Sequence, residues 1–205
     1  LSRNAWLKGT PEWESTPMEQ LRGKVLGIVG LGNIGAHLAR IGQGFGMKIL
    51  VHTRTPDPAK APGVEVEFRS FDDLLPEADY LALCMPLTEE TRRMIRTETI
   101  RKMKKEAFLI NVSRGEAAVT ADLAAAMEEG RLAGLGLDVT DPEPLPEDHP
   151  LRSVPNVLIT PHHASRTRET DAAALDRTAE NIRMAIEGKR PINLVNPEVL
   201  GRAAR

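Results

Sequence analysis

The sequence predicts an α/β fold in which a doubly wound parallel sheet is covered by helices. Seven short apolar runs alternate along the chain with segments of helical periodicity, a pattern typical of repeated strand–helix–strand units. Most of these runs are apolar almost throughout, as expected for strands that are buried on both faces. The predicted strands are Val25–Val29, Lys48–Val51, Val64–Phe68, Tyr80–Met85, Ala107–Val112, Ala133–Val139 and Val157–Thr160.

Helical segments fit between these strands. The predicted helices are Ile34–Phe45, Phe71–Leu75, one or two within Thr88–Lys105, and Ala121–Glu129 with Thr120 as its N-cap. The last helix is the most clearly marked, because Ser165 or Thr167 can cap its start and Gly188 can end it. Its apolar stripe, with spacings of four, three and four residues, consists of Leu175, Ala179, Ile182 and Ile186.

The chain divides into three parts by pattern. Residues 1–20 hold both tryptophans and show no period, so they are expected to form an arm. Residues 21–188 carry the strands and helices of the main domain, and residues 189–205 form a tail. Within the domain, the segment Asp141–Pro150 is expected to be an irregular loop, because four prolines exclude it from a helix or a central strand.

Composition limits the classes of function. The chain has 205 residues, 41% of them hydrophobic, which is enough for a sizeable core. A net charge of -2 provides no basic face for nucleic acid, and no apolar stretch approaches the roughly 20 residues that span a membrane. No cluster of side chains has metal-ligand spacing. The single cysteine, Cys84, lies in an apolar run, so we expect a buried small side chain and a protein of the reducing cytoplasm.

A glycine-rich turn directly after the first strand carries the strongest functional signal. Gly30-Leu31-Gly32-Asn33-Ile34-Gly35 matches G-x-G-x-x-G between a strand and a helix, the position in which a Rossmann domain binds a dinucleotide. Gly30 would allow the tight turn, Gly32 the close approach of a pyrophosphate, and Gly35 the packing of helix on strand. The alternative is a glycine-rich turn that binds nothing.

The end of the second strand bears on the choice of cofactor. NAD enzymes usually place an acid there to accept hydrogen bonds from the adenosine ribose, but His52-Thr53-Arg54-Thr55 contains none. A 2′-phosphate could be held by the Arg54 guanidinium and by the hydroxyls of Thr53 and Thr55. This favours NADP(H) over NAD(H). The alternative is an Arg54 that stacks on the adenine, which would suit either cofactor.

Polar residues follow three later strands, at the edge where an open α/β sheet binds its ligands. They are Arg114, the pair Asp138 and Glu143, and His162. Reduction of a 2-oxo acid needs a cation for the carboxylate, a proton donor that titrates near neutral pH, and a carboxylate that orients this donor. Taken singly, Arg114 could be a surface residue, Glu143 one acid of a polar loop and His162 a helix-entry residue.

Several segments together resemble the D-isomer-specific 2-hydroxyacid dehydrogenases. The resemblance runs from about Leu21 to Leu200 and rests on Leu21-Arg22-Gly23-Lys24, Met85-Pro86-Leu87-Thr88, Asn111-Val112-Ser113-Arg114-Gly115, Leu137-Asp138-Val139, Pro142-Glu143-Pro144-Leu145 and Thr160-Pro161-His162. It implies that Arg114 anchors the substrate, that His162 is the acid/base and that Glu143 orients it. The cofactor-binding residues expected from motif and resemblance together are Gly30, Gly32, Asn33, Ile34, Gly35, Thr53, Arg54, Thr55, Met85, Pro86, Val112, Ser113, Arg114, Asp138, His162 and Ala164.

The function expected on this basis is hydride transfer between NAD(P) and a small 2-hydroxy or 2-oxo acid, such as glyoxylate, hydroxypyruvate or a phosphoglycerate-like acid. In this family a long N-terminal segment and the C-terminal tail together build the substrate domain, so residues 189–205 are expected to be a remnant of that domain that returns to it. Weak or no activity is therefore expected for the 205-residue chain alone. The resemblance also implies a homodimer formed through the arm at residues 1–20. Two alternatives stay open: an NAD(H)-sensing binding module of the corepressor type, and a dimerisation module with a vestigial nucleotide site.

Overall fold

The computed structural model describes residues 19–201, and the arm expected at residues 1–20 therefore lies almost wholly outside the described residues. The chain forms two compact units that divide after Pro161, and each is described by itself. The division falls between the last strand and the last helix. No helix in the described part is both long enough and apolar enough to cross a membrane.

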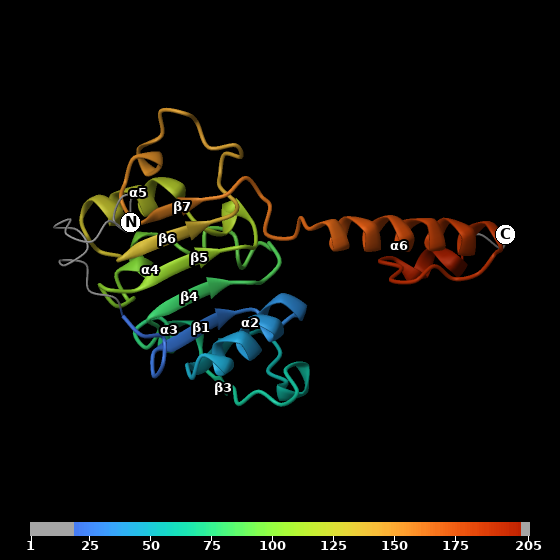
Figure 1. Ribbon diagram of the computed structural model, residues 1–205, viewed down its shortest axis with the longest axis horizontal. Helices are drawn as coiled ribbons and strands as arrows, with labels where there is room; N and C mark the ends of the chain where they lie inside the picture. The colour runs from blue at the N-terminus through green and yellow to red at the C-terminus, as the bar shows by residue number, and fades with distance from the viewer. Residues whose placement is uncertain (1–18, 202–205) are drawn as a thin grey trace, which may run out of the picture. The chain divides into compact units, whose positions relative to one another are not determined.

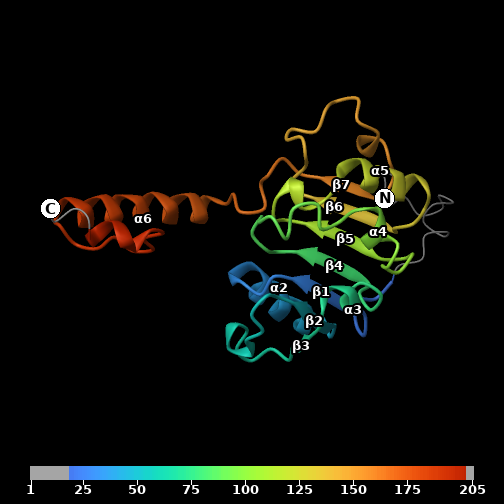
Figure 2. The same ribbon diagram turned by 180° about the vertical axis from the view of Figure 1, so that it is seen from behind.

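The first unit is built on a parallel sheet of seven strands, which confirms the predicted doubly wound α/β class. The strand order is β3-β2-β1-β4-β5-β6-β7. Figure 1 shows the strands side by side, and Figure 2 shows the same sheet from behind. The winding direction reverses between β1 and β4, and ligands of such sheets bind beside this point, at the carboxyl ends of the strands. The strands are β1 Val25–Val29, β2 Lys48–His52, β3 Glu67–Phe68, β4 Tyr80–Leu83, β5 Phe108–Asn111, β6 Gly134–Leu137 and β7 Val157–Ile159.

Helices cover both faces of this sheet. Leu26 and Ile28 of β1 belong to a buried cluster shared with helix α2, Asn33–Gly44. Val29 and its neighbours on the opposite face belong to a larger cluster shared with three other helices. These helices are α3 Phe71–Leu74, α4 Thr97–Ile100 and α5 Thr120–Glu128. Because strand side chains alternate between the two faces, each central strand is buried on both, as its almost wholly apolar sequence predicts.

Two predicted elements differ from the structure. The strand expected over Val64–Phe68 is reduced to β3, because the Gln43 side chain of α2 accepts a hydrogen bond from the Glu65 N–H at 2.7 Å and donates one to the Gly63 carbonyl at 3.1 Å. Within Thr88–Lys105, only α4 is an α-helix. The chain before it pairs instead with the segment that follows β5, since the Ile95 N–H donates to the Ala117 carbonyl at 3.0 Å.

The expected N-cap of α5 is also corrected. Val119 occupies the cap position, and Thr120 is the first helical residue. The Thr120 hydroxyl is engaged elsewhere, because it donates to the backbone carbonyl of Asp141 at 2.6 Å. A long-range contact has therefore replaced the local cap that the sequence predicts.

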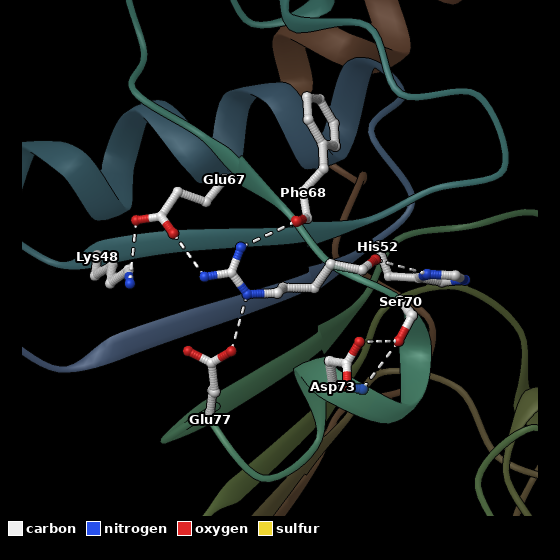
Figure 3. A network of polar contacts seen from close by, with 8 residues as sticks. Lys48, His52, Glu67, Phe68, Ser70, Asp73 and Glu77 are labelled. Carbon is white, nitrogen blue, oxygen red and sulfur yellow. Dashed lines mark hydrogen bonds and ion pairs between the residues drawn. The ribbon is translucent and has the colours of Figure 1, made fainter.

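A polar network holds the edge of the sheet at the β2 and β3 strands (Figure 3). The Arg69 guanidinium binds Glu67 at 2.6 Å and Glu77 at 2.9 Å, and Lys48 binds Glu67 at 3.1 Å. The Arg69 carbonyl accepts a hydrogen bond from His52 Nδ1 at 3.2 Å, which fixes the side chain of the last residue of β2. The network therefore fixes the end of the strand that leads into the Thr53–Thr55 turn.

The second unit contains one long helix, α6 Arg168–Ile186, and the tail that follows it. Of the two expected caps, Thr167 is the one used: its hydroxyl accepts from the Thr170 N–H at 3.1 Å. Gly188, with φ of 69°, ends the helix as predicted. The tail returns along α6, since the Ile192 N–H donates to the Asn181 side chain at 2.8 Å, and it ends in the short 3-10 helix η4, Pro197–Gly201.

Candidate functional site

The glycine turn after β1 has the geometry that a phosphate-binding turn requires. Gly30 has φ of +97°, and a Cβ there would lie 2.8 Å from the Met85 backbone. A Cβ on Gly35 would lie 2.1 Å from the Gly30 carbonyl oxygen, so side chains are excluded at both positions. At Gly32, in contrast, a Cβ would meet nothing within 4 Å. The open side of this turn is therefore at Gly32, where a pyrophosphate would approach.

Helix α2 begins directly at this turn. Gly32 is its N-cap residue, and no side chain caps the helix. Asn33, Ile34 and Gly35 form its first turn, whose N–H groups have no partner within the helix. No acidic residue lies in this turn, so the partial positive charge of the helix end remains available to an anion.

A backbone hydrogen bond connects this turn to the end of β2. The Gly30 N–H donates to the His52 carbonyl at 2.8 Å. The His52 ring is held in turn by the Arg69 carbonyl and by Phe71, whose ring centroid lies 5.6 Å away. The Thr53–Thr55 turn therefore starts from a fixed position relative to the glycine turn.

A cavity of about 530 Å³ lies between these two turns and the end of β4. This volume is in the usual range for small-molecule and cofactor sites. The predicted cofactor-binding residues that line it are Gly30, Gly32, Thr53, Arg54, Thr55, Met85 and Pro86. An open Gly32, an uncapped helix end and a cavity of this size fit a dinucleotide, and these residues would hold its pyrophosphate and adenosine ribose.

The cavity is also lined by three residues that the sequence did not indicate as part of the site, Lys60, Glu90 and Cys84. Lys60 lies in a connection between predicted elements and Glu90 near the start of a segment that was expected to be helical, so no local pattern marked either residue as part of the site. Glu90 accepts a hydrogen bond from the Thr88 hydroxyl at 2.6 Å. That bond, together with the Glu90 backbone N–H and the nearby positive charge of Arg54, lowers the pKa of the Glu90 carboxyl. Cys84 also lines the cavity, and burial raises its pKa to about 11, so the thiol stays protonated at neutral pH.

The loop after β5 holds Arg114 through a buried asparagine. Asn111 Oδ1 accepts from the Ser113 N–H at 3.0 Å and from its hydroxyl at 2.9 Å. Asn111 Nδ2 donates to the Arg114 carbonyl at 2.9 Å. The Arg114 guanidinium donates to the Ser113 carbonyl at 2.7 Å. Asn111 is therefore a positioning residue, which the motif contained but to which sequence reasoning assigned no role.

The loop after β6, which carries Glu143, lies directly against the Arg114 loop. A Cβ on Gly115 would lie 1.9 Å from the Thr140 carbonyl oxygen, so the two backbones are in contact. Glu143 Oε2 accepts a long hydrogen bond of 3.4 Å from the Thr140 N–H. Thr120 supports the same loop through its bond to Asp141. Arg114 and Glu143 are thus carried on two adjoining loops.

The remaining predicted residues lie at the ends of β5, β6 and β7. Val112 continues from β5, and Asp138 follows β6, where its Oδ1 accepts from the Thr160 hydroxyl at 2.6 Å. His162, with φ of 54°, comes three residues after β7 and opens the second unit together with His163 and Ala164. In the described part of the chain, no three His, Cys, Asp or Glu side chains gather as they would around a metal ion.

The strand order, the glycine turn and the cavity beside it define a dinucleotide-binding domain of the Rossmann type. Residues 2–164 match the sequence profile of the D-isomer specific 2-hydroxyacid dehydrogenase NAD binding domain. The chain belongs to this family, which confirms the resemblance found in the sequence.

Individual proteins that are similar to this chain include dehydrogenases and reductases. The chain is 45% identical over 181 residues to a glyoxylate reductase of Aeropyrum pernix, with 88% of this chain and 54% of that protein covered. The crystal structure of the TT0316 protein from Thermus thermophilus superposes with a TM-score of 0.85 at 42% identity, over 93% of this chain and 58% of that one. D-lactate dehydrogenase with NAD+ from Lactobacillus jensenii gives 0.82 at 30% identity, over 87% and 57%. The chain spans about half the length of the curated relatives it matches.

Proposed function

We propose that this chain is the cofactor-binding part of an NAD(P)-dependent oxidoreductase that interconverts a small 2-oxo acid and the corresponding D-2-hydroxy acid. The observation that carries the proposal is the pair of adjoining loops that present Arg114 and Glu143 on the sheet whose glycine turn borders the cavity. The glyoxylate reductase of Aeropyrum pernix makes glyoxylate the first substrate to test, with hydroxypyruvate and phosphoglycerate-like acids next.

The proposed chemistry assigns one role to each side chain. The cofactor supplies a hydride to the carbonyl carbon of the 2-oxo acid. Arg114 binds the substrate carboxylate and polarises the carbonyl, since a guanidinium offers a bidentate fork. His162 donates the proton that the carbonyl oxygen takes up, and Glu143 orients the imidazole and stabilises its protonated form. Asp138, Val112, Ser113 and Ala164 would border the nicotinamide end.

In the same proposal NADPH is preferred to NADH. No carboxylate stands among residues 52–55 to accept hydrogen bonds from the ribose hydroxyls or to repel a 2′-phosphate. Arg54 and the hydroxyls of Thr53 and Thr55 line the cavity at that point. They would bind the phosphate by charge-assisted hydrogen bonds.

Separate titrations of the chain with NADH and NADPH, followed by fluorescence of the reduced nicotinamide, test the preference. NADPH should bind more tightly. Arg54→Ala should weaken NADPH about tenfold and NADH no more than about twofold, because only NADPH loses an ion pair. An equal loss for both cofactors would show that Arg54 supports the adenine and would remove the basis for NADPH preference.

Turnover is tested in the whole protein. His162→Ala should lower kcat with glyoxylate by about 10²- to 10⁴-fold, the usual contribution of a positioned acid. Unchanged turnover would contradict the assignment of His162. Cofactor-dependent binding of a partner protein without any turnover would instead favour the NAD(H)-sensing module.

The organisation of the whole protein is also a proposal. Residues 189–205 would lead back into a substrate domain, and two copies would form a dimer through residues 1–20. The cytoplasmic location expected from the single cysteine stays a prediction.

A further inference from the structure

We propose that Lys60 is a second cation for the 2′-phosphate of the cofactor and that it determines NADPH preference together with Arg54. This inference rests on the proposed function, and it assigns a role to a residue outside the glycine turn and outside β2. Lys60 ends the short 3-10 helix η1, Pro58–Lys60, in the connection between β2 and β3. It lines the same cavity as Arg54 and the two threonines beside it.

The backbone that carries Lys60 is fixed from both sides. The Asp57 side chain accepts from the Ala59 N–H at 3.0 Å and so caps η1, and Pro58 preorganises its first position. The next residue, Ala61, is 1% exposed and packs in the cluster under α2. Because a capped turn and a buried alanine flank the lysine, only its side chain must reorganise when an anion binds.

Further along, α2 itself anchors this connection. The two hydrogen bonds of the Gln43 side chain, to the Gly63 carbonyl and from the Glu65 N–H, tie the segment after Lys60 to the helix. The same helix begins at the glycine turn that would bind the pyrophosphate. Lys60 and the pyrophosphate site are thus placed by one rigid element.

The charges around the cavity explain why one cation would not suffice. Arg54 lies near the Glu90 carboxylate, which is ionised at neutral pH and lines the same cavity, so part of the Arg54 charge is already compensated. A 2′-phosphate carries a charge of about -2 above its second pKa of about 6. Lys60 adds the positive charge that makes this end of the cavity attractive to such an anion.

Lys60 also differs from three lysines elsewhere on the sheet edges. Lys48 binds Glu67 at 3.1 Å, Lys102 binds Asp72 at 2.8 Å and Lys104 binds Asp79 at 2.7 Å. Lys60 forms no ion pair with any carboxylate of the described residues. A cation that faces a cavity without a carboxylate of its own is suited to an anionic ligand.

Calorimetry on the chain at about pH 7.5 and low salt should compare the binding of 2′,5′-ADP with that of 5′-ADP. The difference between the two affinities measures the contribution of the 2′-phosphate, without the nicotinamide and without turnover. Lys60→Gln should weaken 2′,5′-ADP about three- to tenfold and change 5′-ADP by less than about twofold. Lys60→Arg should retain the binding of 2′,5′-ADP, since the positive charge is kept. Lys102→Gln, which removes an exposed lysine outside the cavity, is the matched control and should change neither affinity.

The outcomes separate this inference from the proposal on which it rests. If Arg54→Ala weakens 2′,5′-ADP selectively while Lys60→Gln has no effect, the role of Lys60 is wrong and the NADPH preference stands. If Lys60→Gln weakens both ligands equally, the lysine shapes the cavity and does not read the phosphate, and the inference is overturned. If the unaltered chain binds 2′,5′-ADP no more tightly than 5′-ADP, both the preference and the role of Lys60 are overturned.

Discussion

Two glycines of the same turn should respond in opposite ways to the same substitution. In Gly35→Ala the new Cβ meets the Gly30 carbonyl at 2.1 Å, so the backbone must shift. We expect a loss of about 1–3 kcal/mol in the free energy of unfolding, the usual cost of overpacking, and a lower melting temperature.

In Gly32→Ala the Cβ enters open space, so the melting temperature should change by no more than about 2 °C. NADH binding should fall at least about tenfold, because the methyl group occupies the path of the pyrophosphate.

Thermal unfolding and NADH titration of both variants measure this contrast. Gly44→Ala is the control, because its Cβ also meets nothing within 4 Å and Gly44 lies at the far end of α2. It should change neither quantity beyond the small gain from replacing a helical glycine. Full NADH affinity in Gly32→Ala would place the pyrophosphate elsewhere.

The Cys84 thiol should be poorly reactive although it lines the cavity. Burial raises its pKa from 9.0 to about 11, which leaves about a hundredfold less thiolate at about pH 8. Alkylation by iodoacetamide at that pH should therefore be about a hundredfold slower in the native chain than in the unfolded chain. Comparable rates in both states would contradict the desolvation of the half-buried thiol, and a Cys84→Ser variant gives the background of the assay.

At the scale of the elements, Asp79 joins the starts of two strands and should contribute to stability above about pH 4. Its carboxylate accepts from the Val25 N–H of β1 and from Lys104, both at 2.7 Å, directly before β4. Burial raises the pKa of Asp79, but the bonds from Lys104 and Val25 and the nearby lysine charges outweigh burial, so the pKa is lowered. A lowered pKa in the folded state stabilises the fold above the unfolded pKa of about 3.9, and this stability is lost as the pH falls through the folded value.

Asp79→Asn should therefore lose about 1–2 kcal/mol at about pH 7 and markedly less at about pH 2. Urea unfolding at the two pH values measures the difference. Asp72→Asn removes an ion pair in which both side chains are largely exposed, and it should cost less than about 0.5 kcal/mol. An equal loss for Asp79→Asn at both pH values would mean that shape, and not charge, determines the role of this residue.

Strands such as β1 and β4 were predictable because burial on both faces makes their sequences apolar throughout, and α2 because a glycine turn precedes it. The strand expected over Val64–Phe68 and the helix expected from Thr88 were wrong in extent. There the backbone groups bind partners distant in sequence, Gln43 in one case and the segment after β5 in the other. No local period reports such bonds.

The site shows the same division. The places of Gly30 and Gly32 at the cavity were predictable, because dinucleotide binding demands glycines at that spacing. The place of Arg54 was predictable because it directly follows the second strand. Lys60 and Glu90 were not, because they enter the cavity from connections whose course depends on packing against α2 and on local hydrogen bonds. Sequence motifs mark residues that chemistry fixes, and they miss residues that only the fold brings to the cavity.

At the scale of the whole molecule, binding and turnover should separate in this 205-residue chain. The glycine turn, the cavity and the end of β2 all lie within the first unit, so the chain by itself should bind NADH or NADPH with one site per molecule. Reduction of a 2-oxo acid also requires that water is excluded and the substrate enclosed, usually by closure of a second domain. The match to the glyoxylate reductase of Aeropyrum pernix covers only 54% of that protein.

We therefore expect turnover with glyoxylate below about 1% of that of the Aeropyrum pernix enzyme under the same conditions, even with saturating cofactor, since closure and orientation can contribute several orders of magnitude to the rate. The decrease in absorbance as NADPH is oxidised, followed beside calorimetric titration of the same sample, measures both quantities. A chain that binds cofactor and turns over glyoxylate at a comparable rate would contradict this separation of binding from turnover. A chain that fails to bind either cofactor would instead overturn the dinucleotide site on which every other proposal depends.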